Sequence, residues 1–325
     1  MPFGELWDGH LCKVMDHTGC LSVKGLAASL MVASLAPAQI SIAPAPLAEY
    51  EGPTFTANTR LVLVHASVVD SRRRLMTNLP RSAFDVRENG VAQSLKVFRR
   101  EDIPVSIGIM VDNSGSMREK RAQVAAAALE FVRASNPLDE VFIVNFDNHP
   151  YLDQAFTNDA KKLEQALRRA PSDGGTAMWD AAGMAMDYLV REGKKDKRVL
   201  VIITDGTDNH SRLKLAEVVR RAQQQDILIY CIGILGRARI PEARRALHQL
   251  ATASGGMDYY PDSVREMRAI TPRIANEIRN QYTLGYTPRN SVLDGTFRKI
   301  AVLVKTKGHF SVRGRNGYYA TVGGK

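Results

Sequence analysis

Five oxygen-bearing side chains stand where apolar runs end or where a glycine-rich loop turns. They are Asp112, Ser114, Ser116, Thr176 and Asp205. The first three alternate in a short loop after the apolar run 105–111, Thr176 follows two glycines, and Asp205 ends the run 199–204. Carboxylate and hydroxyl oxygens, without Cys or His, suit a hard cation such as Mg²⁺ or Mn²⁺. Because only two of the five are carboxylates, the ion would stay under-neutralised and would attract a further carboxylate from a partner protein.

The region that holds these side chains alternates apolar runs with helical patterns. Continuous Val/Ile-rich runs predict strands covered on both faces, and they lie at 105–111, 140–146, 199–203 and 227–232. Helical spacing of apolar residues predicts helices at 118–134, 159–169, 178–191, 212–225, 241–253 and 264–279. This alternation predicts an α/β fold with a doubly wound, mostly parallel sheet. Ligands of such sheets bind beyond the carboxyl ends of the strands, which is where Asp112 and Asp205 fall.

Two β-rich segments flank this region. The alternating runs 84–87 and 94–98 surround Asn89-Gly90, so we expect them to pair as a hairpin. Strand patterns return at 281–286, 297–305 and 310–313, and Arg72-Arg73-Arg74 is expected to form a solvated hairpin tip. Each flank is short for an independent domain. We therefore expect 59–102 and 281–320 to form one small β domain, with the α/β domain 103–280 inserted.

The five oxygen-bearing residues match a known pattern. Asp112-x-Ser114-x-Ser116, a later Thr176 in a Gly-rich loop and the strand-ending Asp205-Gly206 resemble the metal-ion-dependent adhesion site of von Willebrand factor type A (VWA) domains. The resemblance implies that the serines and the threonine are direct or switchable ligands of the ion. It implies that the two aspartates hold the ion directly or through water. It further implies that a Glu or Asp of a bound protein supplies the sixth ligand.

The flanks resemble a narrower group. Phe84-Asp85-Val86-Arg87-Glu88-Asn89-Gly90 before the α/β region, and Tyr282-Thr283-Leu284-Gly285-Tyr286 with Gly317-Tyr318 after it, are similar to the VWA-related proteins abundant in Acidobacteria. Together the two resemblances span residues 57–320. The narrower group has no settled biochemical role. The resemblance therefore predicts the fold of the flanks but says little about function.

The N-terminal segment has the features of an export signal. Lys24 precedes an apolar run at 25–36, and Ala36-Pro37-Ala38 follows as a small-residue cleavage site. We expect residues 1–38 to be a signal peptide region, with Met15 as a plausible start, and 39–58 to be an Ala/Pro-rich linker. The protein would then be periplasmic or secreted. The alternative is a cytoplasmic protein that keeps this tail. No later stretch is long and apolar enough to suggest a membrane span.

The charge distribution and the motifs of the sequence argue against two classes of function, nucleic-acid binding and catalysis. The net charge of +10 is concentrated in the flanks, with +6 over residues 57–100, +8 over 262–325 and −1 over 101–261. No aromatic-interleaved basic motif accompanies it, so nucleic-acid binding is not expected. Asp112–Ser116 superficially resembles a trypsin-like serine motif, but the α/β alternation contradicts that fold. Asp205-Gly206 resembles a loop of haloacid-dehalogenase phosphatases, in which a nucleophilic Asp lies two residues earlier. This chain has Ile203 at that position. We therefore expect no enzyme activity.

The sequence therefore predicts a divalent-metal-dependent protein-binding module for adhesion or assembly. An intracellular scaffold using the same metal site is one alternative. Binding of anionic surfaces through the basic flanks is another. Asp208, Asn209 and His210 are expected in a solvated loop or at the rim of the site. Met117, Trp179 and the strand residue Cys231 are expected in the core, and one cysteine after residue 38 allows no internal disulfide.

Overall fold

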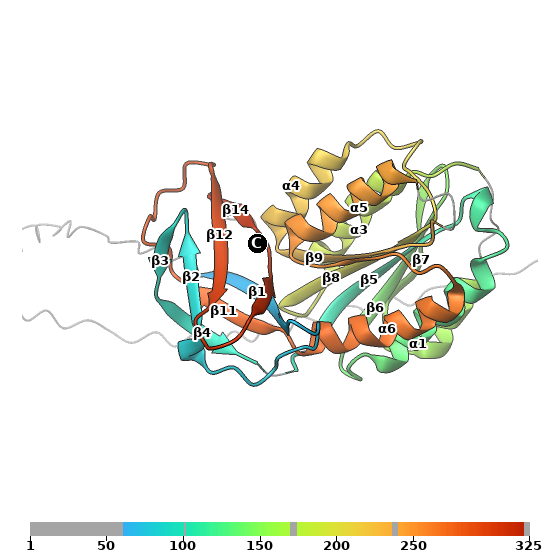
Figure 1. Ribbon diagram of the computed structural model, residues 1–325. Coiled ribbons are helices and arrows are strands. Elements are labelled where there is room, and N and C mark those ends of the chain that lie inside the picture. Colours follow the sequence, from blue (N-terminus) through green and yellow to red (C-terminus); the bar gives the residue numbers. More distant parts are fainter. Residues whose placement is uncertain (1–60, 101, 170–173, 236–239, 322–325) are drawn as a thin grey trace, which may run out of the picture. The chain divides into compact units, whose positions relative to one another are not determined.

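The computed structural model describes residues 61–100, 102–169, 174–235 and 240–321 (Figure 1). The predicted signal region and linker lie outside these ranges. The central sheet has six strands in the order β10-β9-β8-β5-β6-β7. Its strands are β5 (Val105–Asp112), β6 (Glu140–Phe146), β7 (Pro150–Thr157), β8 (Lys197–Thr204), β9 (Ile227–Gly233) and β10 (Asp258–Tyr259). All neighbours pair in parallel except β7, which runs antiparallel to β6.

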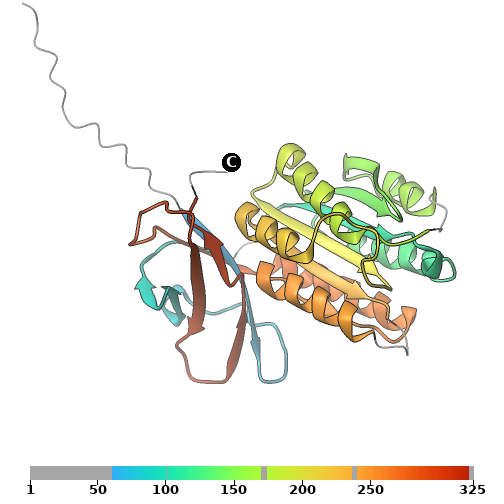
Figure 2. The ribbon, with the colours of Figure 1, turned by 90° about the horizontal axis from the view of Figure 1, so that it is seen from above.

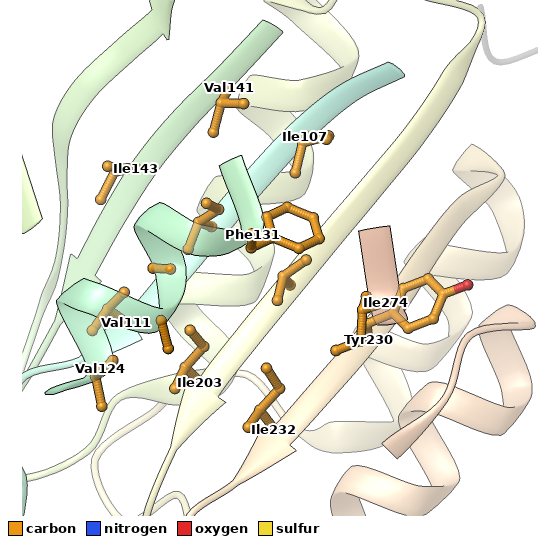
Figure 3. Packing of buried hydrophobic residues seen from close by; sticks show 14 of the residues in the cluster. Ile107, Val111, Val124, Phe131, Val141, Ile143, Ile203, Tyr230, Ile232 and Ile274 are labelled. Atoms are coloured by element: carbon orange, nitrogen blue, oxygen red, sulfur yellow. The ribbon is translucent and has the colours of Figure 1, made fainter. Parts of the chain in front are cut away.

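Helices cover both faces of this sheet (Figure 2). One face carries α1 (Arg121–Ala134), α2 (Ala160–Arg169) and α6 (Val264–Arg279), and the other carries α3 (Met178–Glu192), α4 (Leu215–Gln225) and α5 (Pro241–Ser254). Every residue of β5 and β9 is buried because the strands lie between these layers. Figure 3 shows the first face, where Phe131 of α1 and Ile274 of α6 pack on the strand residues Ile107, Ile203 and Tyr230. The predicted α/β fold class is confirmed.

Two elements of the sheet escaped prediction. β7 is a half-exposed edge strand, so it lacks the continuous apolar run of its neighbours. β10 has only two residues and is held by parallel pairing with β9. Two helices also begin three residues later than predicted. Before α1 the chain forms a short 3₁₀ turn at Gly115–Met117, and before α4 Lys214 forms the cap, its backbone N–H donating to the Glu217 carboxylate.

The flanking segments build two antiparallel four-stranded sheets, ordered β13-β1-β11-β4 and β14-β12-β2-β3. From the N-terminal flank come β1 (Val62–Asp70), β2 (Phe84–Glu88), β3 (Val91–Gln93) and β4 (Leu95–Arg99), with a 3₁₀ turn at Arg81–Ala83. The C-terminal flank supplies β11 (Tyr282–Tyr286), β12 (Phe297–Val304), β13 (Phe310–Arg313) and β14 (Gly317–Tyr319). β1 pairs with β11 and β13, and β2 pairs with β12, so each sheet joins both ends of the chain around a shared apolar core.

The predicted hairpin is partly wrong. Asn89 and Gly90 do form a tight turn, with φ of 48° and 86°, as the left-handed geometry of such a hairpin requires. However, the strand that returns onto β2 is the short β3. The run 94–98, predicted to pair with 84–87, becomes β4 and pairs with β11 in the other sheet. Its alternating pattern fits either sheet equally well, so the pattern alone could not assign its partner.

In the described ranges, no helix combines the length and apolar character that crossing a bilayer requires.

Candidate functional site

Asp112 lies at the carboxyl end of β5 and is fully buried. Its Oδ1 accepts a hydrogen bond of 2.8 Å from the Ser114 backbone N–H, which turns the chain sharply into the loop. Its Oδ2 accepts a hydrogen bond of 2.6 Å from the hydroxyl of Thr204 at the end of β8. Asp112 thereby ties the ends of two neighbouring parallel strands together.

Two serines and the second aspartate form the next layer of the site. The hydroxyls of Ser114 and Ser116 are 3.1 Å apart, and Ser116 donates a hydrogen bond of 2.7 Å to Asp205 Oδ1. Ser114 and Asp205 are buried, whereas Ser116 is exposed. Oxygens from residues 89 positions apart in the chain are thus in direct contact at one edge of the sheet, with one hydroxyl facing solvent.

Thr176 is placed by amide side chains from two other loops. Its N–H donates to Asn209 Oδ1 at 2.8 Å, and the N–H of Gly175 donates to Asn148 Oδ1 at 2.7 Å. A methyl carbon added to Gly206 would lie 4.0 Å from the Thr176 hydroxyl oxygen, so this hydroxyl lies beside the Asp205-Gly206 loop. The structure therefore brings all five predicted residues to one place.

Both carboxylates of the site are buried. Burial raises the pKa of Asp112, and the negative charge of Asp205 raises it further, against the lowering effect of its hydrogen bonds. Asp205 is paired with the ammonium of Lys120, which lies 2.5 Å from its Oδ2. The site thus holds two buried carboxylates, one of which already faces a cation. Such a group attracts a positive ion.

The donor set fits a hard divalent cation. It consists of two carboxylates and three hydroxyls, the ligand types that Mg²⁺ and Mn²⁺ prefer. Throughout the described ranges, no three side chains of His, Cys, Asp or Glu form a group that could hold a metal ion by themselves. A metal ion bound here would therefore need the hydroxyls as well as the two carboxylates.

Several residues that position the site were not predicted. Thr204 and Lys120 contact the two aspartates, while Asn148 and Asn209 hold the Thr176 loop. Asn209 belongs to a loop predicted to be solvated or at the rim, and its side chain is exposed yet anchors Thr176. No sequence signal marks these residues, because each acts on a loop that is distant in the chain. Met117, Trp179 and Cys231 are buried in the core, as predicted.

The α/β part of the chain is similar to known proteins. Residues 107–207 match the family model described as von Willebrand factor type A domain. A curated relative, inter-alpha-trypsin inhibitor heavy chain H4 of Sus scrofa, is 25% identical over 211 residues, which cover 60% of this chain but only 22% of that protein. The match therefore spans less than a quarter of the relative's length.

Solved structures with similar chains include two bacterial proteins. The vWF domain of the type V pili tip protein Mfa5 from Porphyromonas gingivalis aligns with a TM-score of 0.47 and 15% identity, covering 55% of this chain and 95% of that one. The conserved hypothetical protein BatB from Bacteroides thetaiotaomicron aligns with a TM-score of 0.43 and 19% identity, covering 53% and 98%.

Proposed function

We propose that the von Willebrand factor type A domain of this chain is a protein-binding module whose affinity depends on Mg²⁺ or Mn²⁺. The partner supplies an Asp or Glu carboxylate that completes the coordination of the ion. The observation that carries the proposal is the contact between Ser114, Ser116 and Asp205, with Thr176 beside them and Asp112 behind. Carboxylate and hydroxyl oxygens grouped in this way support a site for a hard cation, and the exposed Ser116 gives a partner protein a way to reach it.

Each residue has a role in that proposal. Asp112, Ser114, Ser116, Thr176 and Asp205 would hold the ion, which supplies positive charge for a partner's carboxylate. Ser116 is the exposed member and marks the open side. Buried Asp112 keeps the loop and the β8 end in register through its two hydrogen bonds. None of these contacts activates a nucleophile, so the proposed module binds rather than catalyses.

We also infer that the flanks are of the Acidobacteria type, from the sequence resemblance of residues 84–90, 282–286 and 317–318.

We further infer that the protein is exported and works in the periplasm or outside the cell. The inference rests on the signal-like sequence of residues 1–38. Sequencing the mature N-terminus from the native host tests it. A start near Gln39 is expected, whereas a protein that retains residues 1–38 in the cytoplasm would favour the intracellular scaffold.

Thermal denaturation of the full chain tests ion-bridged carboxylate binding. A ligand that binds only the folded state raises the melting temperature. We expect Mg²⁺ to raise it, millimolar acetate to raise it further only when Mg²⁺ is present, and EDTA to remove both effects. Asp112→Ala should abolish both shifts, whereas the control Asp187→Ala, at an exposed position on α3, should retain them. An acetate effect that persists in EDTA would contradict the proposal.

A further inference from the structure

A cavity of about 560 Å³ lies at the edge of the central sheet, away from the proposed ion site. Its walls come from β10, from helix α6 and from the turn that follows β1, and none of the five proposed ion ligands lines it. Its volume is within the usual range for ligand pockets, roughly 300–1,000 Å³. The cavity is therefore a separate place at which a ligand could be bound.

The cavity wall holds four arginines and three acids, Asp258, Glu266 and Glu277, so its formal charge is +1. The arginines are Arg73, Arg244, Arg273 and Arg313. Arg313 is paired with Glu277 at 2.7 Å. For the other three arginines, the described part of the chain offers no carboxylate partner. The two remaining acids of the wall have other contacts, although both keep their negative charge: Asp258 lies 3.0 Å from His248, and Glu266 accepts the N–H of Asp262 at 2.8 Å.

Arg73 is held in an uncommon backbone conformation at the mouth of this cavity. Its φ is 60°, a left-handed value that costs a residue with a long side chain free energy. The Asp70 carboxylate accepts the N–H groups of Arg72 and Arg74 at 2.9 and 2.8 Å, and the Arg73 N–H donates to the Asp70 carbonyl at 2.9 Å. The turn therefore fixes the backbone of Arg73. Arg72, Arg73 and Arg74 are all exposed, as expected of a solvated tip, and Arg73 also lines the cavity.

The rest of the cavity surface is aromatic and apolar. The Arg244 guanidinium lies 4.2 Å from the ring centre of Tyr260, whose hydroxyl donates to the Arg244 carbonyl at 2.9 Å. Leu75, Met257 and Ile270 add apolar surface. A stacked guanidinium keeps its N–H groups free for planar recognition of a carboxylate. The surface therefore suits a ligand with both carboxylates and apolar side chains.

We propose that this cavity is a second binding site, one that takes an acidic peptide segment of a partner protein, with its carboxylates on Arg73, Arg244 and Arg273. An extended peptide is favoured over a small anion because β10 is the outermost strand of the central sheet and, among the residues that the structure describes, pairs only with β9. The site uses arginine side chains rather than an ion, so it works without Mg²⁺.

Fluorescence anisotropy on the full chain tests this site. The probe is a short labelled peptide in which glutamate and leucine alternate, measured in EDTA. We expect binding that the Arg73→Gln/Arg273→Gln double variant weakens by at least about tenfold, since each loses charged hydrogen bonds. Both side chains are exposed, so folding should be unaffected. The control Arg245→Gln, an exposed neighbour on α5 outside the cavity, should bind as the wild type does.

Other outcomes would overturn the proposal. Absence of binding in EDTA, or equal weakening by Arg245→Gln, would show that the cavity is not the site. Equal binding of a glutamine-leucine peptide would exclude recognition of carboxylates. Displacement of the peptide by inorganic phosphate at lower concentration than by unlabelled peptide would assign the cavity to a phosphate compound instead. The peptide binding is measured in EDTA, where no divalent ion is available. Absence of peptide binding would therefore count against the cavity and not against the ion-dependent function.

Discussion

At the residue scale, Lys120 has the most direct influence on ion binding after the ligands themselves. Its ammonium is already 2.5 Å from Asp205 Oδ2, in the position of a cation that a divalent ion must compete with or displace. We predict that Lys120→Met tightens Mg²⁺ binding by about fivefold to tenfold, because the site loses a positive charge. Calorimetric titration measures this, with Lys161→Met on exposed α2 as the control. Weaker binding would mean that Lys120 supports the ion.

Asn209 acts on the site through the backbone of Thr176. Removing its Oδ1 leaves the Thr176 N–H without the 2.8 Å acceptor that fixes the loop. A hydrogen bond of this kind contributes about 1 kcal/mol, so we predict that Asn209→Ala weakens Mg²⁺ binding by roughly fivefold. The melting temperature without metal should change little, since the side chain is exposed. The exposed Asn158→Ala serves as the control, and equal affinities of both variants would contradict this role.

The residue types of the five proposed ligands could be recognised from the sequence. Two carboxylates and three hydroxyls at loop positions indicate their own chemistry, and their spacing resembles a known motif. Lys120 and Asn209 could not be found in the same way. A lysine or asparagine in a loop is ordinary, and its role depends on which distant loop the fold brings to it.

At the element scale, Lys197 at the start of β8 links the sheet to helix α6. It is buried, its ammonium donates to the Ile278 carbonyl, and burial lowers its pKa to about 7. Between this value and the unfolded value of 10.5, the unfolded chain binds more protons than the folded chain. Stability should therefore rise with pH across that window.

The prediction is that the free energy of unfolding of the wild type rises by on the order of 1 kcal/mol per pH unit relative to Lys197→Met between about pH 7.5 and 9.5. Urea denaturation of both proteins at the two pH values measures the difference. Because both proteins share all other titrating groups, the contributions of those groups to the pH dependence of the free energy of unfolding cancel in the difference. Parallel changes in the two proteins would show that Lys197 does not titrate in this window.

Elements buried on both faces were predictable, and edge elements were not. β5, β8 and β9 read as continuous apolar runs because helices cover both of their faces. β7 and β10 lie at the two edges of the sheet, where one side of the backbone has no partner and apolar runs are not required. β4 was identified as a strand, but its partner depended on a long-range choice between two sheets.

At the scale of the whole molecule, Glu277 of α6 connects the α/β fold to the flanking strands. Its carboxylate accepts the Ser67 hydroxyl of β1 at 2.9 Å and pairs with Arg313 of β13 at 2.7 Å. Glu277 is largely buried, while the Arg313 side chain is 26% exposed. Removing the guanidinium would leave a nearly buried charge without its cation, which is costly even when the pair itself adds little stability.

We predict that Arg313→Met destabilises the protein by about 2 kcal/mol, less than for a fully buried pair because solvent reaches Arg313. Adding Glu277→Gln should recover more than half of the loss, since the uncompensated charge disappears. Urea denaturation of the two single variants and the double variant measures the coupling. Additive losses would show that the pair makes no specific connection between the flanks and α6.

The central claim is that the five oxygen-bearing residues hold a divalent ion. Calorimetric titration of the full chain with Mn²⁺ and Mg²⁺ tests it most directly, in wild type, Asp112→Ala and the exposed control Asp187→Ala. We expect a single site in the wild type and in the control, and its loss in Asp112→Ala. Binding that survives in Asp112→Ala, or no binding to the wild type even with acetate present, would contradict it.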